Sequence, residues 1–409
     1  MSENRSHNPL NPALSRRELL SLAGRGVASL GVMSFLAACG VKGSSQPKVK
    51  GLQVLPAKAG QLVIAQWPLY IDQDDKTKKR PSIEKFTQAT GIKVTYKEVI
   101  EDNESFFGTV RETLARGEPT GWDLYVITDW LVAKQIRLGY LETLHLDRLP
   151  NFTANAGAVF QNPSYDPGNL HSVPWQGGIT GIAYNPKLTG REITSFDDLF
   201  DPKFKGKVGM FTEMRDTVNL ALIGQGVDPL KATIDDVKSV QQRLLKQKKD
   251  GIVRAYYGNE YTDALAKGDI WVTIAWSGDI FQLQDSSPDL KFIVPKEGGV
   301  LWVDNLVIPK GAAHPTDAHE YMNFVYRPDI AALITAGVHY IAPVPATSDI
   351  IRQTAATAKT KNERDALMRV ASSPLVYPTQ DMESRLHHYK VLDEAEEKAW
   401  NDLFQKVIT

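Results

Sequence analysis

Short apolar runs and amphipathic stretches alternate along the chain from about residue 62 onward. The runs have the length of β-strands and are bounded by polar residues or glycine, whereas the stretches between them carry apolar side chains at helical spacing, as Phe106, Val110 and Leu114 do. Strands that alternate with helices predict an α/β fold with largely parallel sheets. The predicted strands are 62–65, 93–99, 124–127, 179–184, 208–211, 271–276, 292–294 and 303–308, and further helices are predicted at 82–89, 217–223, 234–245, 317–326 and 329–336, the last ending at Gly337.

Aromatic and acidic residues gather where the predicted strands end. Open α/β sheets bind ligands at the carboxyl ends of their strands, so these residues are the first candidates for a site. Aromatic rings attract cations and carboxylates bind ammonium groups, so an aliphatic chain with an amine at each end would match both. The candidates that follow predicted strands are Trp67, Tyr70, Thr128, Trp130, Glu213 and Asp216. Trp276 ends a predicted strand, and Trp302 and Asp304 flank the start of the next one.

Each of these residues also has an ordinary structural role open to it. Glu213 and Asp216 stand where a helix begins, where acids offset the helix dipole, and Thr128 could cap the helix that follows its strand. The tryptophans could belong to the core, and Asp304 could cap a turn. The combination of rings and acids, rather than any one residue, favours a binding site.

The first forty residues have the features of an export signal. The motif Ser15-Arg16-Arg17-Glu18-Leu19-Leu20 resembles a twin-arginine signal, and the apolar stretch behind it ends in Leu36-Ala37-Ala38-Cys39, which resembles a bacterial lipobox. We expect residues 1–38 to be a signal peptide, Cys39 to be lipidated, and residues 39–60 to form a tether to the membrane. The alternative is a signal peptide that ends near a buried cysteine.

Composition excludes several classes of protein. Residues 1–38 hold four Arg and two Glu, so 43 basic and 46 acidic residues remain, a net charge of −3 that argues against nucleic-acid binding. Cys39 is the only cysteine, which rules out an internal disulfide. The chain has no Gly-x-Ser-x-Gly, His-Glu-x-x-His or dinucleotide glycine motif, and the pair His387-His388 has no partner at metal-ligand spacing. We therefore expect no enzyme, no cofactor and no metal.

Several motifs resemble those of one family. The segment from Pro295 to Pro309, PKEGGVLWVDNLVIP, closely resembles a signature of bacterial spermidine/putrescine-binding proteins of polyamine ABC transporters, which are extracellular solute-binding proteins. The resemblance covers the body from about Leu62 onward. Agreeing segments, in the same order, are QWPLYI at 66–71, TGIKV at 90–94, WDL at 122–124, VPW at 173–175, AYNP at 183–186 and SFDDLFDPKFKGK at 195–207.

The resemblance implies a type II periplasmic-binding-protein fold, in which two α/β lobes joined by a hinge enclose the ligand in a cleft. It implies a first lobe of 61–175 plus 303–345 and a second of 176–302 plus 346–409, with chain crossings near 174–178, 300–304 and 345. The implied function is that of a monomeric, exported protein, periplasmic or at the cell surface and anchored through its lipidated cysteine. Such a protein captures a polyamine and delivers it to an ABC permease.

The family's ligand residues can be placed on matching positions of this chain. For the rings, the resemblance implies that Trp67 and Tyr70 form the first aromatic pair, that Trp276 and Trp302 enclose the methylene chain, and that Tyr340 lines the cleft. For the amines, it implies that Glu213 and Asp216 meet one of them and that Asp304 pairs with another. Thr128 and Trp130 would supply a hydroxyl and a ring.

The chain also departs from the family pattern. Trp130 stands where a tyrosine is common, Gln176–Gly178 lacks an aromatic residue, 73–80 is inserted, and a family glutamine has no clear counterpart, although His388 or Tyr389 lies nearby in sequence. These departures leave the preferred amine open. Other readings are a binder of a sugar, metal ion or anion, an exported enzyme, and a polyamine sensor without a transport role.

Overall fold

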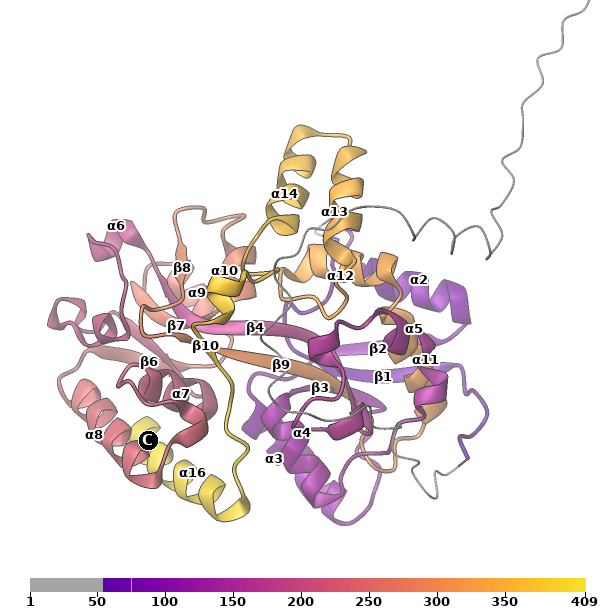
Figure 1. The fold of residues 1–409 in the computed structure, drawn as a ribbon, viewed down its shortest axis with the longest axis horizontal. Coiled ribbons are helices and arrows are strands. Elements are labelled where there is room, and N and C mark those ends of the chain that lie inside the picture. The colour runs from indigo at the N-terminus through magenta and orange to yellow at the C-terminus, as the bar shows by residue number, and fades with distance from the viewer. Residues whose placement is uncertain (1–53, 75) are drawn as a thin grey trace, which may run out of the picture. The chain divides into compact units, whose positions relative to one another are not determined.

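Strands and helices alternate through most of the body, as the sequence predicts (Figure 1). The computed structural model describes residues 54–74 and 76–409, so Arg16, Arg17, Cys39 and the predicted signal peptide 1–38 lie outside the described residues. The strands are β1 (Gln61–Gln66), β2 (Lys93–Glu98), β3 (Leu124–Thr128), β4 (Ser172–Tyr184), β5 (Val208–Phe211), β6 (Val253–Tyr257), β7 (Val272–Trp276), β8 (Lys291–Ile293), β9 (Gly299–Val307) and β10 (Leu386–His387).

The helices follow the strands in the expected order. They are α2 (Pro81–Thr90), α3 (Asn103–Ala115), α4 (Asp129–Leu138), α5 (Pro150–Asn155), α6 (Pro186–Thr189), α7 (Met214–Ile223), α8 (Ile234–Lys249), α9 (Tyr261–Ala266), α10 (Ser277–Leu283), α11 (Pro315–Val325), α12 (Pro328–Val338), α13 (Thr347–Ala356), α14 (Lys361–Ala371), α15 (Gln380–Glu383) and α16 (Glu394–Ile408). In the described part of the chain, no helix combines the length and the apolar character that crossing a membrane requires.

The strands form two α/β halves that share a central antiparallel pair. The strand order is β2-β1-β3-β9-β4-β7-β5-β6, with β10 beside β9 and β8 beside β4. In the first half β1 pairs in parallel with β2 and β3, and in the second half β5 pairs in parallel with β6 and β7. The predicted α/β architecture with two lobes is therefore confirmed.

Strands β4 and β9 run from one half into the other. They pair with each other from Ser172↔Val307 to Thr180↔Val300, with a register shift between Pro174 and Gln176. Beyond this shared stretch, β9 pairs with β3 in the first half and β4 pairs with β7 in the second. The predicted crossings near 174–178 and 300–304 lie on these two strands.

The exact lobe boundaries stay a prediction. Within the segment 346–409, assigned to the second lobe, α16 packs against α8, but α13 packs against α12 and α14. Helix α12 in turn contacts α2 of the first half. The segment therefore divides its contacts between the halves, which the sequence does not indicate.

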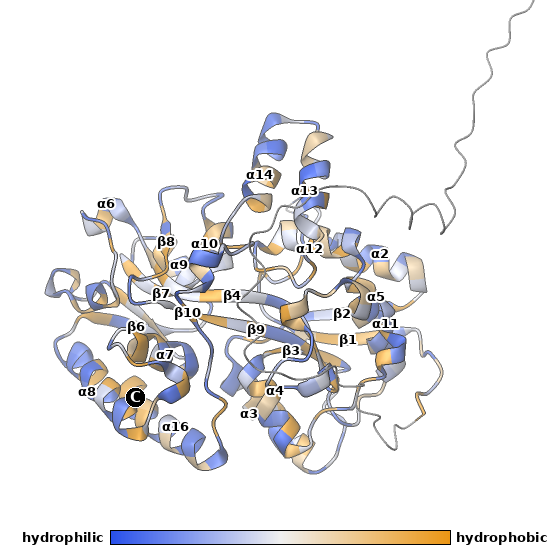
Figure 2. Cartoon of the chain, in the orientation of Figure 1, coloured by the Kyte–Doolittle hydropathy of each residue, from blue (hydrophilic) through white to orange (hydrophobic). Residues whose placement is uncertain are grey.

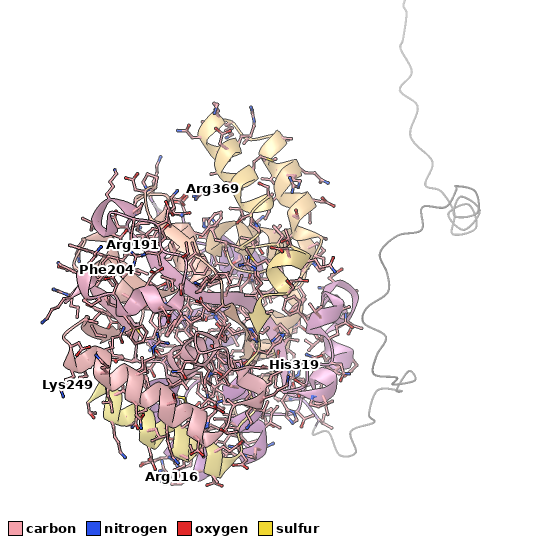
Figure 3. All side chains as sticks on the ribbon, turned by 60° about the vertical axis from the view of Figure 1, so that its left-hand side comes forward. Arg116, Arg191, Phe204, Lys249, His319 and Arg369 are labelled. Carbon is pink, nitrogen blue, oxygen red and sulfur yellow. The ribbon has the colours of Figure 1, made fainter. Side chains whose placement is uncertain are left out.

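Burial follows the position of each strand. All residues of β3 and β7 are buried, as expected for inner strands covered by helices on both faces, whereas the edge strand β2 is largely exposed. Helix α8 buries Val237, Val240 and Leu244 on one stripe and turns its charged residues outward, a contrast visible in Figure 2. Basic side chains such as Arg116 and Lys249 lie at the periphery of the body (Figure 3).

The end of the predicted tether lies against the body. The backbone N–H groups of Ala59 and Gly60 donate to the carboxylate of Asp317 on α11, at 2.8 and 3.1 Å, and Lys58 forms an ion pair with Glu320 at 3.1 Å. Residues 58–60 are therefore attached to α11, and the predicted tether 39–60 is not free of the body along its whole length.

The predicted stop at Gly337 is wrong. Helix α12 continues to Val338, and His339 ends it in the left-handed conformation with φ of 60°. Gly337 serves close packing instead, since a Cβ there would come within 2.7 Å of the backbone of Asp72.

Candidate functional site

A pocket lies between the two halves, where strands end and helices begin. Its empty volume is about 390 Å³, the space open to solvent at its mouth included. Eight of the ten predicted residues line it, and none of the lining residues is a lysine or arginine. The lining consists of Trp67, Pro68, Tyr70, Asn103, Thr128, Asp216, Asn259, Trp276, Asp279, Trp302, Asp304, Tyr340 and Tyr389.

Asp304 is the acid contributed by the crossing strand β9. Its Oδ1 accepts a hydrogen bond from the hydroxyl of Thr128 at 2.7 Å, and that hydroxyl accepts one from Nδ2 of Asn103 at 2.9 Å. The sequence suggested that Thr128 could cap α4, but its side chain forms no capping hydrogen bond. Its hydroxyl orients the Asp304 carboxylate instead.

Asp216 lies in the first turn of α7 and is bound by two hydroxyl groups. Tyr389 donates to its Oδ1 at 2.7 Å, and Thr180 of β4 donates to the same oxygen. Thr180 in turn accepts from Nε1 of Trp302 at 3.0 Å. The carboxylate is thus connected to one of the pocket rings through a single hydroxyl.

Asp279, in the first turn of α10, is a third acid of the pocket. The hydroxyl of Tyr340 donates to its Oδ1 at 2.6 Å and the hydroxyl of Tyr261 to its Oδ2 at 3.0 Å. Tyr261 also accepts from the backbone N–H of Trp276 at 3.1 Å. This network connects Asp279 to a second pocket ring.

The three acids are buried without a counter-cation. Each is at most 5% exposed, and within residues 54–74 and 76–409 none forms an ion pair with a Lys, Arg or His side chain. Burial raises the pKa of Asp304 to about 7 and the pKa values of Asp216 and Asp279 to about 6, against the lowering effect of their hydroxyl donors. A bound cation would favour the ionised carboxylates and lower these pKa values.

Aromatic rings enclose the space between the acids. Trp67 and Trp276 meet edge to face with centroids 6.0 Å apart, and Tyr340 contacts both Tyr70 at 5.0 Å and Trp302 at 5.6 Å. Nε1 of Trp67 is anchored by the backbone carbonyl of Val126 at 3.1 Å. The rings are fixed by neighbours rather than free to rotate.

Two glycines make room for these rings. A Cβ at Gly178 would lie 2.3 Å from the indole of Trp302, and one at Gly278 would lie 2.4 Å from the ring of Tyr340. At Gly178 an aromatic side chain has no room, because the indole of Trp302 occupies that space.

One buried polar atom of the pocket has no hydrogen-bond partner among the described residues. It is Oδ1 of Asn259, whereas the hydroxyl of Tyr70 lies beside the carboxylate of Asp304 and lowers the pKa of that acid. Buried polar groups are nearly always paired, so Oδ1 of Asn259 indicates a position where a ligand or water would bind.

The structure does not bring Trp130 and Glu213 into the pocket. Trp130 lines a neighbouring cavity, and the guanidinium of Arg215 lies 4.8 Å from its ring centroid. Oε2 of Glu213 accepts from the backbone N–H and Nδ2 of Asn103, at 3.1 and 3.2 Å, and so links the two halves. Glu213 thus acts on a pocket residue and does not itself line the pocket, since its side chain extends across to α3.

Four polar pocket residues were not predicted. Asn103 and Asn259 follow β2 and β6, and Asp279 follows β7, so the strand-end rule applies to all three. Tyr389, which was noted only as a neighbour of a missing glutamine, follows the two-residue strand β10. Among the described residues, no group of three or more His, Cys, Asp or Glu side chains is arranged to hold a metal ion.

Two α/β halves that share crossing strands and enclose a ring-lined pocket define a solute-binding protein. The sequence model of bacterial extracellular solute-binding proteins matches residues 82–364, and the chain belongs to this family.

Individual relatives of this chain are also solute-binding proteins or components of solute transporters by name. The spermidine/putrescine-binding periplasmic protein 1 of Haemophilus influenzae is 28% identical over 87% of this chain and 90% of its own length. The putrescine-binding periplasmic protein SpuD of Pseudomonas aeruginosa is 28% identical over 85% and 91%. A solved Listeria monocytogenes structure, a candidate spermidine/putrescine ABC transporter, superposes with a TM-score of 0.72 at 26% identity, covering 85% of this chain and 99% of the other.

Proposed function

We propose that this protein captures a polyamine outside the cytoplasm and delivers it to the permease of an ABC importer. The observation that carries the proposal is the presence of three buried carboxylates that have no counter-cation in the described part of the chain, set among aromatic rings in one pocket between two lobes. The names of the relatives in Haemophilus influenzae and Pseudomonas aeruginosa support the same ligand class.

The chemistry of the pocket suits an aliphatic polycation. Methylene groups would pack on the rings of Trp276 and Trp302, while ammonium groups would pair with the acids. A neutral sugar would leave buried carboxylates without a partner, which is costly. Micromolar binding requires only about −8 kcal/mol, which a few such contacts can supply.

The number of acids bears on the choice of amine. Spermidine has three amines and would give Asp216, Asp279 and Asp304 one ammonium each, whereas putrescine has two and would leave one acid unpaired. We therefore propose that spermidine binds more tightly than putrescine. Removal of one acid should reduce this difference.

Export and anchoring are part of the proposal. Arg16 and Arg17 would direct twin-arginine export, and Cys39 would carry the lipid that holds the protein at the membrane beside its permease. We propose a monomeric binding protein without catalytic activity. Cys39→Ala should release the protein from the membrane fraction, and unchanged membrane association would contradict the lipid anchor.

Calorimetric titration of the purified protein with spermidine and putrescine tests the ligand, with maltose as control. One-to-one binding of polyamines, with no heat from maltose beyond dilution, is expected for the pocket between the lobes. Absence of polyamine binding by folded protein would refute the ligand assignment and leave the fold and family standing.

A further inference from the structure

A second, larger cavity lies beside the pocket between the lobes. Its empty volume is about 820 Å³. It is lined from both halves: by the start of α4, by the loop 159–165, by the short helical turn at Leu230 and by the segment 388–391 after β10. We call this cavity the rear cavity. Its lining comprises Asp129, Trp130, Val159, Phe160, Pro163, Ser164, Tyr165, Leu230, Val303, His388, Tyr389 and Val391.

The rear cavity and the first pocket lie on opposite faces of β9. Trp302 and Asp304 line the first pocket, whereas Val303 between them lines the rear cavity. Successive side chains of a strand point to opposite faces of its sheet. Among the described residues Tyr389 alone lines both, so the two spaces share almost none of their lining.

Asp129 gives the rear cavity a buried acid. Its side chain is 6% exposed, Oδ1 accepts from the backbone N–H of Trp130 at 2.6 Å, and Oδ2 accepts from that of Val303 at 3.2 Å. A carboxylate can accept about four hydrogen bonds, so acceptor capacity remains. No Lys, Arg or His side chain within residues 54–74 and 76–409 forms an ion pair with Asp129, and burial raises its pKa to about 7.

The other titratable groups around the cavity do not neutralise this acid. Burial lowers the pKa of His388, which favours its neutral form, and the hydroxyl of Tyr165 donates to Oδ1 of Asn305 at 3.0 Å. Arg215 contacts the ring of Trp130 and donates to the carbonyl of Lys390 at 3.0 Å. Its effect on the pKa of Asp129 is smaller than those of burial and of the two backbone hydrogen bonds.

The cavity also offers apolar surface and an opening. Rings of Trp130, Phe160 and Tyr165 line its interior. Nε1 of the buried Trp130 has no hydrogen-bond partner in the described part of the chain. At the rim, Val159, Leu230 and Val391 are 79%, 53% and 51% exposed, so the cavity is open to solvent.

We propose that the rear cavity is a second amine-binding site, in which an ammonium group pairs with Asp129 and an apolar chain packs on the neighbouring rings. The ligand would be a second polyamine molecule or another organic amine with an apolar body. This inference rests on the proposed function only for the class of ligand. The residues that line the rear cavity, apart from Tyr389, are not those of the first pocket.

Equilibrium dialysis with labelled putrescine tests the site, because it counts bound molecules directly. We expect two molecules per chain at high concentration. Asp129→Asn should remove the second and leave the affinity of the first within twofold, which also shows that the variant is folded. Asp304→Asn should do the reverse and weaken the first site only.

Two variants of the exposed residue Val159 test the site without a change to the core. Val159→Arg places a positive charge at the rim and should weaken the second site several-fold at low salt, whereas Val159→Gln should leave it unchanged. Cyclohexylamine, a monoamine with an apolar body, should bind the parent protein in an Asp129-dependent way if the natural occupant is not a polyamine.

The outcomes separate the two proposals. One bound putrescine per chain, unaffected by Asp129→Asn, together with no Asp129-dependent binding of cyclohexylamine, would overturn the second site and leave the first intact. Loss of all polyamine binding in the parent protein would refute the proposed function, and the cyclohexylamine experiment would then decide the rear cavity alone.

Discussion

Replacement of Asp304 by asparagine removes the charge of one pocket acid and preserves its shape. Burial raises the pKa of Asp304 from 3.8 to about 7, so keeping the carboxylate ionised without a cation costs on the order of 4 kcal/mol. A bound ammonium group offsets this cost. Oδ1 of the asparagine can still accept from Thr128, so the side chain should keep its position.

Loss of one partner of a buried charged pair weakens binding by about 2–5 kcal/mol. Because the asparagine variant also avoids the cost of ionisation, we expect roughly 2–4 kcal/mol, which corresponds to about 30- to 1000-fold weaker spermidine binding. Calorimetric titration at pH 8, where the parent carboxylate is ionised, measures the difference.

The same variant should change how stability depends on pH. The folded-state pKa of Asp304 lies above the unfolded value, so the stability that its protonation contributes is present below about pH 4 and is lost as the pH rises through 7. Without ligand, Asp304→Asn should therefore show a flatter dependence of unfolding free energy on pH between about 4 and 7 than the parent protein.

Asp123→Asn is the matched control. Asp123 is a buried acid at the opposite end of β3, where it accepts from the backbone N–H groups of Val63 and His314. Its replacement should lower stability and leave spermidine affinity unchanged. Equal affinity of the parent protein and the Asp304 variant would refute the role assigned to this carboxylate.

Three further predictions follow from the pocket. Spermidine affinity should fall by at least tenfold from pH 8 to pH 5, because Asp216 and Asp279 have pKa values of about 6 and must lose their protons to bind ammonium; a flat pH profile in calorimetry would contradict this. Gly178→Ala should displace the indole of Trp302 and weaken binding at least tenfold in the same titration, while Gly108→Ala, where a Cβ meets nothing within 4 Å, should have no effect. Trp302→Leu should weaken binding by about 1–2 kcal/mol through loss of the ring, and an unchanged dissociation constant would show that this ring does not contact the ligand.

The strand-end rule predicted Trp67, Tyr70, Thr128, Asp216 and Trp276, because the carboxyl ends of strands from both halves face one another at the pocket. Trp302 and Asp304 lie within β9 rather than at its end, and Tyr340 was placed only by the family resemblance. It was applied to rings, acids and the hydroxyl of Thr128 but not to amides, which is why Asn103 and Asn259 were overlooked. Asp279 sits in the first turn of a helix, where an acid is commonly explained by the helix dipole.

Other features depend on contacts between distant parts of the chain. Tyr389 reaches Asp216 across 173 positions, and the two-residue strand before it has no detectable pattern. The rule gives the position of a residue at a strand end but not the direction of its side chain. The rule therefore could not show that Trp130 lines the neighbouring cavity, or that Glu213 binds Asn103 and does not itself line the pocket.

The crossing pair β4 and β9 determines how the lobes could move relative to each other. Both strands stay hydrogen-bonded from Ser172↔Val307 to Thr180↔Val300, so separating the lobes must twist and bend a two-stranded ribbon rather than swing two loose linkers. Deformation should concentrate where the ladder is already irregular, between Pro174 and Gln176. Because Trp302 and Asp304 belong to this ribbon, torsion of the ribbon would move them against the acids on α7 and α10. Mechanical stiffness of the crossing would then contribute to the rate of ligand release.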